Sequence, residues 1–479
     1  MRTLILVAIV TMTTNPILAE DDIPWWKREK IRFMWGCWGL AGTDKNTRWE
    51  GRDVPREVFR NVALSGGTVF TDTWYYKAAH ARLTKEFGMK YFAPAHLSHL
   101  AWLSGGRTWI NKKGEEDRVS SGPKNPIKCP LDQAIYEHWL VGAGKMEGIR
   151  EGIIDGIHVD WEATEGRTCY CDDCFTNFVD RQGMNESVPE KTKRFDWLKD
   201  RDHLKAYEQS FHQQRVEMFT RIRDKLRAIR PNLLFSSYNV LQPHLVDFLQ
   251  AMHTAELPFL VLDARHYQND DRQPWWESYS PRLKQEDYLY IAGGWTNALF
   301  ASQPSQVSAA RWIYETSINE DGCWLWFEHE LTNDNLRAYA AADRDIKAVQ
   351  AKVGKYLFHG TRDLNFVTAV EWSGRPELEK AIVHRTYHLG NQHLVHVNNI
   401  DTEWPLRVRV RFTRLSADKR WTVQDPMGNL FYSQDDKSAM WPSTQLKEGV
   451  VVAMEPRSDL FLLISPVDED LAIDPSHLI

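Results

Sequence analysis

Three polar side chains occupy alternate positions of one short apolar segment. Residues 154–162 read Ile-Asp-Gly-Ile-His-Val-Asp-Trp-Glu, and the polar residues are His158, Asp160 and Glu162. Side chains alternate between the two faces of a strand, so these three are expected on one face, with successive Cα atoms about 6–7 Å apart. Carboxylates held together in this way are suited to general acid–base chemistry.

The surrounding chain alternates between short apolar segments and helical stretches. It predicts seven further strands, at 31–38, 67–74, 89–95, 233–238, 259–263, 288–294 and 323–327, and helices at 55–64, 77–87, 132–151, 203–230, 245–253, 305–318 and 334–353. Eight such units predict a (β/α)₈ TIM barrel, whose chemistry lies at the C-terminal ends of its strands. A doubly wound open sheet is the alternative, but no glycine-rich phosphate loop follows an early strand.

The last part of the chain has a different pattern. Short alternating segments separated by turn residues are found at 381–387, 393–397, 406–412, 420–423, 450–454 and 459–464. They predict an antiparallel β-sandwich, which we expect to support the barrel rather than to bind carbohydrate. The predicted organisation is a signal peptide at 1–19, a catalytic barrel at 20–354 and the sandwich at 355–479.

Composition and the first residues limit the possible partners. The net charge of −6, with acids and bases interspersed, argues against nucleic acid or an anionic membrane as the main partner. Arg2, an apolar run at 4–10 and Ile17-Leu18-Ala19 resemble a secretory signal, so we expect a secreted or periplasmic protein. No later segment has 18 consecutive apolar residues, so no integral membrane segment is expected in the mature protein. The 21 tryptophans include flat rings that suit sugar faces.

Polar and aromatic residues follow the predicted ends of several strands. Together they would form a polar and aromatic mouth that suits a carbohydrate. Besides His158, the candidates for binding substrate are Asp72, Trp74, His96, Tyr238, Asn239, His266, Tyr267, Trp295, Asn297, Trp326 and Glu328, with His99 and Glu330 nearby.

Four cysteines are spaced as metal ligands often are. Cys169, Cys171 and Cys174 follow the central segment, and Cys129 lies 169 − 129 = 40 residues upstream of Cys169. This spacing predicts a structural zinc, because four thiolates leave no open position for water. The alternative is two disulfides within the same set. No organic cofactor is expected. Cys37 and Cys323 are predicted on neighbouring strands, either as a bridge or as two buried thiols.

The segment from Asp155 to Glu162 resembles the fourth-strand signature of family 18 glycoside hydrolases, the chitinases and their relatives. It matches the acidic positions of that signature at Asp155, Asp160 and Glu162, and it differs at His158, where the family has Asp. Two weaker similarities are residues 260–263 on the sixth strand and 322–326 on the eighth. The resemblance implies that Glu162 is the general acid and that Asp160 orients an N-acetyl group of the substrate.

The cysteine cluster is similar to that of many family 42 β-galactosidases, where four cysteines hold a structural zinc after the acid/base strand. Glu162 would match the acid/base residue, but Trp161 replaces the expected Asn, and the seventh strand has no Glu to act as a nucleophile. Several uncharacterised barrel hydrolase-like families share the same strand and cluster. A third arrangement pairs Asp160, as nucleophile, with Asp263 and resembles that of α-galactosidases and related enzymes.

These observations predict a secreted glycoside hydrolase that cleaves an oligo- or polysaccharide, with Glu162 as general acid/base assisted by Asp160. His158 is expected either to hydrogen-bond Asp160 or to be a satisfied core histidine. The alternative function is a catalytically inactive, carbohydrate-binding barrel. A metal-dependent hydrolase is disfavoured because the early strands lack sets of His and Asp ligands.

Overall fold

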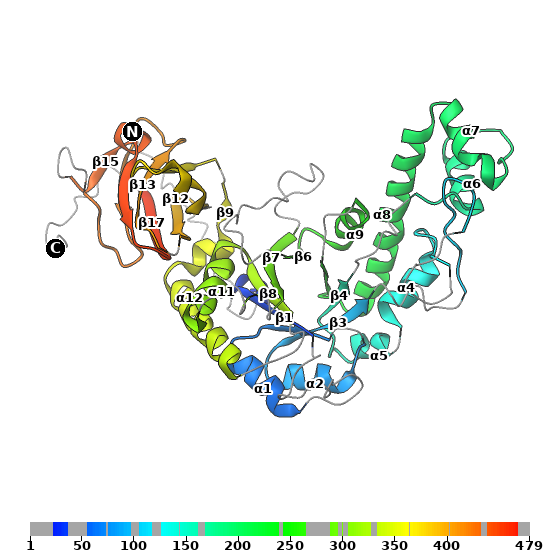
Figure 1. Cartoon of the computed structure of the whole chain (residues 1–479), viewed down its shortest axis with the longest axis horizontal. Coiled ribbons are helices and arrows are strands. Elements are labelled where there is room, and N and C mark those ends of the chain that lie inside the picture. Colours follow the sequence, from blue (N-terminus) through cyan, green and yellow to red (C-terminus); the bar gives the residue numbers. More distant parts are fainter. Residues whose placement is uncertain are drawn as a thin grey trace, which may run out of the picture.

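The structure is a computed structural model. It describes residues 23–36, 55–72, 75–96, 105–116, 126–142, 144–160, 168–238, 243–264, 288–295, 299, 305–326, 333–363, 365–401, 403–432 and 438–467. Figure 1 shows a central barrel with a β domain on one side and a helical extension on the other. No helix within these ranges is long and apolar enough to cross a membrane.

Eight parallel strands close into a barrel in sequence order, which confirms the predicted TIM barrel. The strands are β1 (Ile31–Trp35), β2 (Val69–Thr71), β3 (Lys90–His96), β4 (Gly156–Asp160), β5 (Leu234–Tyr238), β6 (Phe259–Ala264), β7 (Tyr288–Trp295) and β8 (Gly322–Trp326). They are surrounded by α1 (Arg56–Leu64), α2 (Ala78–Glu86), α4 (Gln133–Val141), α5 (Lys145–Arg150), α8 (Leu204–Ile229), α9 (Pro243–Met252), α11 (Gln306–Asn319) and α12 (Asn333–His359).

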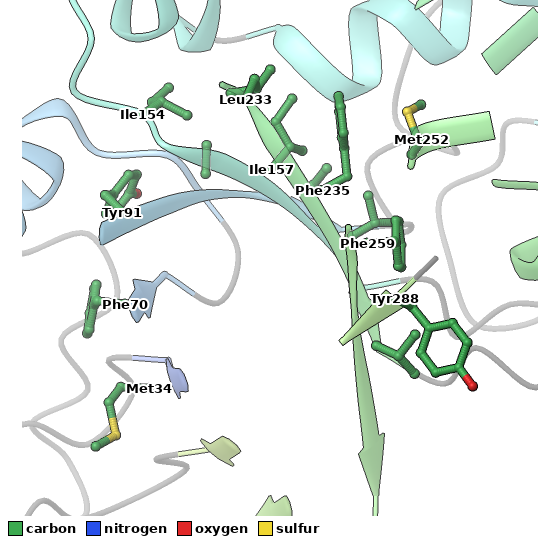
Figure 2. Close-up of a cluster of buried hydrophobic side chains, with 14 of the residues drawn as sticks. Met34, Phe70, Tyr91, Ile154, Ile157, Leu233, Phe235, Met252, Phe259 and Tyr288 are labelled. Atoms are coloured by element: carbon green, nitrogen blue, oxygen red, sulfur yellow. The ribbon is translucent and has the colours of Figure 1, made fainter. Parts of the chain in front are cut away.

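Alternation along each strand divides the apolar side chains into two cores. One set fills the barrel interior, for example Phe33, Phe92 and Trp324. The other packs under the helices, and Figure 2 shows part of it, including Ile157 and Phe235. Both faces of every strand are therefore buried, which is why the strand sequences are nearly continuous apolar runs.

One predicted helix is divided in the structure. The stretch 132–151 forms α4 and α5, separated by a short break that contains Gly142 and Gly144. Gly144 has φ +84°, a left-handed conformation that most residues avoid. The apolar periodicity continued across these glycines, and their backbone conformation ended the helix.

The C-terminal domain is the predicted β-sandwich. A three-stranded antiparallel sheet in the order β10-β13-β16 faces a six-stranded sheet in the order β15-β14-β17-β12-β11-β9. The strands are β9 (Thr361–Arg362), β10 (Val367–Glu371), β11 (Ile382–Leu389), β12 (Gln392–Asn399), β13 (Leu406–Phe412), β14 (Arg420–Gln424), β15 (Met440–Pro442), β16 (Val450–Met454) and β17 (Ser458–Val467), with α13 (Ser443–Glu448). The predicted boundary after residue 354 falls inside α12.

The helical extension has a small core of its own. It contains α6 (Asp172–Arg181), α7 (Arg194–Asp200) and the N-terminal part of α8, at the right of Figure 1. Its buried residues include the four cysteines, with Phe175, Phe178 and Tyr207. Parts of the chain that follow β3 and β4 thus build a satellite domain beyond the barrel.

Candidate active site at the barrel mouth

A histidine and a carboxylate meet at the C-terminal end of the barrel. His96 ends β3 and Asp160 ends β4, and the strand register places them directly opposite each other. His96 Nε2 lies 2.8 Å from Asp160 Oδ2, and both side chains are largely buried. Among the described residues, Asp160 Oδ1 has no hydrogen-bond partner. The carboxylate is therefore fixed on one side and has an oxygen left for a further partner.

His158 lies one layer deeper in the barrel, and its hydrogen bond differs from our expectation. It shares the inward face of β4 with Asp160, but its Nδ1 lies 2.9 Å from Ser236 Oγ on β5. Complete burial lowers the pKa of His158 to about 3, so the ring is neutral. The position is that of a core histidine, but only one ring nitrogen is satisfied, because Nε2 has no hydrogen-bond partner among the described residues. His96 is the partner of Asp160. Strand pairing across the sheet decided which histidine reaches the carboxylate.

Aromatic rings line the interior of the barrel around His158. Trp35, at the end of β1, stacks on Trp326 of β8 with ring centroids 5.4 Å apart and an interplanar angle of 20°. Tyr238 of β5 packs edge-on against Trp35 at 5.3 Å and against Trp324 at 5.4 Å. Tyr238 and Trp326 were predicted, but Trp35 was missed. Trp35 lies two positions after the inward Phe33, so it shares the inward face of β1, and it is the last residue of that strand.

Two predicted carboxylates lie outside the barrel interior. Asp263 follows the inward Leu262 on β6, so its side chain is on the outer face, where it accepts a hydrogen bond from the hydroxyl group of Tyr290. This position does not suit the expected pairing of Asp263 with Asp160. Asp72 is also directed toward the helices: its two carboxylate oxygens lie 2.7 Å from His80 Nδ1 and 2.6 Å from the Tyr91 hydroxyl oxygen. The sequence shows that side chains alternate along a strand, but it does not show which set points into the barrel. In the structure both Asp263 and Asp72 belong to the outward set.

Asp155, the first acid of the resemblance to family 18, lies at the opposite end of the strand. Its carboxylate lies 3.0 Å from Lys85 Nζ and 2.8 Å from Arg230 Nη2. It also accepts a hydrogen bond from the backbone nitrogen of Tyr91 at 3.0 Å. These contacts join β3, β4, α2 and the end of α8, so Asp155 stabilises the packing of these elements.

Several predicted residues lie outside the described residues. They are Glu162, Trp74, Asn239, His266, Tyr267, Asn297 and Glu328, together with Trp161, His99, Glu330 and Cys37. Trp295 belongs to β7, but only its backbone is described. Their roles therefore stay predictions.

The four predicted cysteines form one buried cluster in the helical extension. The four Sγ atoms all lie within 4.8 Å of one another; they belong to Cys129, Cys169, Cys171 and Cys174. The Sγ atom of Cys129 lies 3.3 Å from that of Cys174 and 3.7 Å from that of Cys171. No disulfide links them, and Cys323 is a free, buried thiol on β8. A cluster of this kind is able to hold a metal ion.

The elements around the cluster explain how these sulfurs converge. Cys171 precedes the first turn of α6 and Cys174 lies within that turn, while Cys129 comes from the segment after β3. The hydroxyl of Tyr207 donates a hydrogen bond to the Cys169 carbonyl at 2.6 Å. The backbone nitrogen of Ile110 donates to Cys169 Sγ at 3.4 Å. The cluster therefore ties the two insertions to α8.

The solved structures that are similar to this chain include an α-amylase and two α-galactosidases. An α-amylase from Geobacillus thermoleovorans, complexed with acarbose, has a TM-score of 0.51 at 10% identity, over 94% of this chain and 100% of that one. The GH36 α-galactosidases AgaA and AgaB from Geobacillus stearothermophilus have TM-scores of 0.49 and 0.48 at 11% and 12% identity, over 92% of this chain. The chain spans 56% of the length of these α-galactosidases.

The similarity to the α-amylase, at 10% identity, shows the fold alone, a TIM barrel. It gives no support to the resemblances to families 18 and 42. No protein-family model matches the chain, and no curated protein matches it.

Proposed function

We propose that this protein is a glycoside hydrolase that cleaves an oligo- or polysaccharide at the C-terminal mouth of its barrel. The observation that carries the proposal is the inward carboxylate of Asp160, which His96 contacts at 2.8 Å. The barrel interior below this pair is lined by the rings of Trp35 and Trp326, and Trp35 contacts His158. TIM-barrel enzymes place catalytic groups at this end. The α-amylase of similar fold, which was solved with acarbose, supports the same class of substrate.

Glu162 is the proposed general acid/base. It follows Asp160 by two positions in the sequence. Glycoside hydrolysis requires a proton donor at the leaving oxygen and a second group to stabilise the oxocarbenium-like transition state. Asp160 supplies the second group, either as a nucleophile or by orienting an N-acetyl group of the substrate. Asp263 has no part in this proposal because its carboxylate is on the outer face.

We also propose a structural zinc in the cysteine cluster. A tetrahedral site with Zn–S bonds of about 2.3 Å places sulfurs about 3.8 Å apart, and the measured 3.3 and 3.7 Å are close to this separation. All four ligands would be Cys129, Cys169, Cys171 and Cys174, so the ion would hold the insertions together. One zinc per chain by elemental analysis would support this assignment. Purified protein that contains no zinc would contradict it. So would a zinc-containing protein whose melting temperature does not change when a chelator removes the metal.

The proposed signal peptide at 1–19 implies secretion or export to the periplasm, which suits an enzyme acting on external polysaccharides. Its test is the N-terminal sequence of the exported protein. An N-terminus at Glu20 would support the proposal, and retention of Met1 in a cytoplasmic fraction would contradict it.

The decisive test is Glu162→Gln, which preserves size and removes the ionisable group. Release of reducing sugars from a panel of oligo- and polysaccharides should fall by about 10²-fold or more, while the melting temperature stays unchanged. Glu165→Gln is the matched control, because it changes the same residue type three positions further along. Proton NMR of the first product would distinguish retention from inversion.

The competing function is a carbohydrate-binding barrel without catalysis. It predicts that the wild-type protein binds sugars and releases no product, and that Glu162→Gln leaves the affinity unchanged. A folded Glu162→Gln variant with wild-type turnover would remove Glu162 from the mechanism.

A further inference from the structure

The outer face of the three-stranded sheet carries a row of arginines. Arg407, Arg409 and Arg411 alternate along β13 with the buried Leu406, Val408 and Val410. Alternate residues of a strand lie on the same face about 7 Å apart. The three guanidinium groups therefore form a line on the side of the sheet that faces away from the sandwich core.

This row of charge is not neutralised within the described part of the chain, where none of the three arginines forms an ion pair. The neighbours across the sheet are uncharged: Val370 and Val451 pair with Arg409, Thr368 pairs with Arg411, and Ala453 pairs with Arg407. Arg409 Nε has no hydrogen-bond partner, and Arg411 Nε donates only to the Glu448 carbonyl at 3.3 Å. Like charges in a row repel each other, so a bound anionic ligand would reduce the repulsion between these arginines.

Tryptophan rings stand beside the arginines. Trp372 extends β10, and its backbone nitrogen donates a hydrogen bond to the Arg407 carbonyl at 2.7 Å. The guanidinium carbon of Arg409 lies 3.2 Å from the centre of its ring, yet Trp372 remains 46% exposed. Trp404, just before β13, is equally exposed and lies under Arg375 at 4.3 Å. Each ring thus combines a cation with a large accessible apolar surface.

We propose that this arginine face, formed by Arg407, Arg409, Arg411 and Trp372, binds an anionic polysaccharide. The guanidinium groups would hold carboxylate or sulfate groups of successive sugars, and Trp372 would stack against a sugar ring. An extended polymer with regularly spaced charges matches a straight row of cations. The choice of a polysaccharide rather than another polyanion rests on the proposed function, and the net charge of −6 disfavours nucleic acid.

The experiment measures binding separately from hydrolysis. Affinity gel electrophoresis of the full chain carrying Glu162→Gln would use polygalacturonate, dextran sulfate, neutral dextran and single-stranded DNA. We expect retardation by a polyanionic polysaccharide that weakens as salt is added, and none by neutral dextran. Polygalacturonate and dextran sulfate distinguish carboxylate from sulfate recognition. The binding measurement needs no turnover. It therefore tests the arginine face even if the protein proves not to be a hydrolase.

Two variants locate the site. Replacing Arg407, Arg409 and Arg411 together by Gln should weaken binding by about tenfold or more, since hydrogen bonds to charged groups are the strong ones. The matched control replaces three exposed cations elsewhere on the sandwich, Lys380, Lys419 and Arg420, by Gln. Trp372→Ala keeps the charge and should weaken binding several-fold at high salt.

Four outcomes would overturn the proposal. They are wild-type protein that binds neither polyanion, a triple variant that is folded and binds as the wild type does, equal losses in the control, and stronger binding of single-stranded DNA than of either polysaccharide. Retained affinity in Trp372→Ala would remove the stacking ring from the site. If the triple variant fails to fold, Arg407→Gln alone replaces it as the test, because Arg407 is the most exposed of the three positions. This variant should show a partial loss of binding.

Discussion

Asp155 and Asp160 belong to the same segment, and their surroundings give them different roles. Asp160 faces the mouth beside His96, whereas Asp155 lies between Lys85 and Arg230 at the other end of the strand. A sequence motif lists both as acids of one signature. The structure separates the acid at the mouth of the barrel, next to His96, from the acid that pairs with Lys85 and Arg230.

Replacing each acid by its amide tests this division. Asp160→Asn should lower kcat by about 10²-fold or more and change the melting temperature little, because it removes a charge near the reacting bond. Asp155→Asn should lower the free energy of unfolding by about 3 kcal/mol, because two cations lose their partner. Hydrolysis assays and urea denaturation of both variants measure these effects. If Asp160→Asn keeps its turnover, the carboxylate has no catalytic part.

Lys145 provides a pH-dependent prediction. It is buried, and its ammonium donates hydrogen bonds to the carbonyls of Pro94 at 2.9 Å and Trp139 at 3.0 Å. Burial lowers its pKa to about 7 from the ordinary 10.5. Between these values the unfolded chain binds a proton that the folded protein has released, so the contribution of Lys145 to the free energy of unfolding rises with pH.

Lys145→Met removes this dependence. The free energy of unfolding of the wild type, relative to the variant, should rise by about 2 kcal/mol between pH 7 and pH 9. Urea denaturation at several pH values measures the difference. Lys352→Met, at an exposed position of α12, serves as the control and should give a flat difference. A flat difference for Lys145→Met as well would show that the buried amine does not titrate in this range.

At the scale of the elements, glycines allow the strands to close around large interior rings. A Cβ atom at Gly156 would lie 2.6 Å from the ring of Phe92, and one at Gly293 would lie 1.8 Å from the Trp324 carbonyl oxygen. The ring of Phe92 and the backbone of β8 at Trp324 therefore leave no room for a side chain at these two positions. This requirement explains glycines inside β4 and β7, where strand propensity alone would disfavour them.

Gly293→Ala should destabilise the barrel by about 2 kcal/mol or more, because backbone on β7 or β8 has to move to admit one methyl group. Gly354→Ala is the matched control on α12, where the nearest atom to an added Cβ is 3.4 Å away. That variant should be neutral or slightly stabilising, because alanine favours helix. Thermal unfolding of both proteins measures the contrast. Equal melting temperatures would contradict the close approach of β7 and β8.

At the scale of the whole molecule, the sandwich is joined to the barrel by one partly buried and one buried ion pair. Arg311 on α11 lies 2.5 Å from Asp459 on β17, and Arg385 on β11 lies 3.0 Å from Glu320, just after α11. Figure 1 shows the sandwich beside α11 and α12. These contacts support the expectation that the domain buttresses the barrel, and the opposite sheet remains available for the arginine face.

Asp459→Asn should weaken this junction. Burial by itself would raise the pKa of Asp459, but the hydrogen bond and charge of His396, together with the charge of Arg311, lower it to about 2. The stabilisation is complete above the ordinary value near 4 and is lost as the pH falls toward 2. At pH 7 the variant should lose about 3 kcal/mol.

Denaturation at pH 7 and pH 3 measures this loss, which should be smaller at pH 3. Asp418→Asn, an exposed carboxylate of the same domain, serves as the control and should change little. A loss for Asp459→Asn that stays the same at both pH values would contradict the lowered pKa.

The sequence alone determined the class of fold and predicted where on it the chemistry would lie. Short apolar strands alternating with amphipathic helices specify a barrel, and the turn-rich C-terminal strands specify a sandwich, because each pattern records which faces are buried. The spacing of Cys169, Cys171 and Cys174 likewise predicted a cluster, since close spacing in the chain brings ligands together before any distant contact forms.

Only the tertiary structure decided which side chains meet. Alternation relates His158 to Asp160 on one strand, but it does not tell which face of a doubly buried strand points inward. Barrel closure directed Asp263 and Asp72 outward and Trp35 inward. The register between β3 and β4 then brought His96, 64 residues earlier in the chain, to Asp160. Such contacts depend on the relative shift of neighbouring strands, which no single segment of sequence contains.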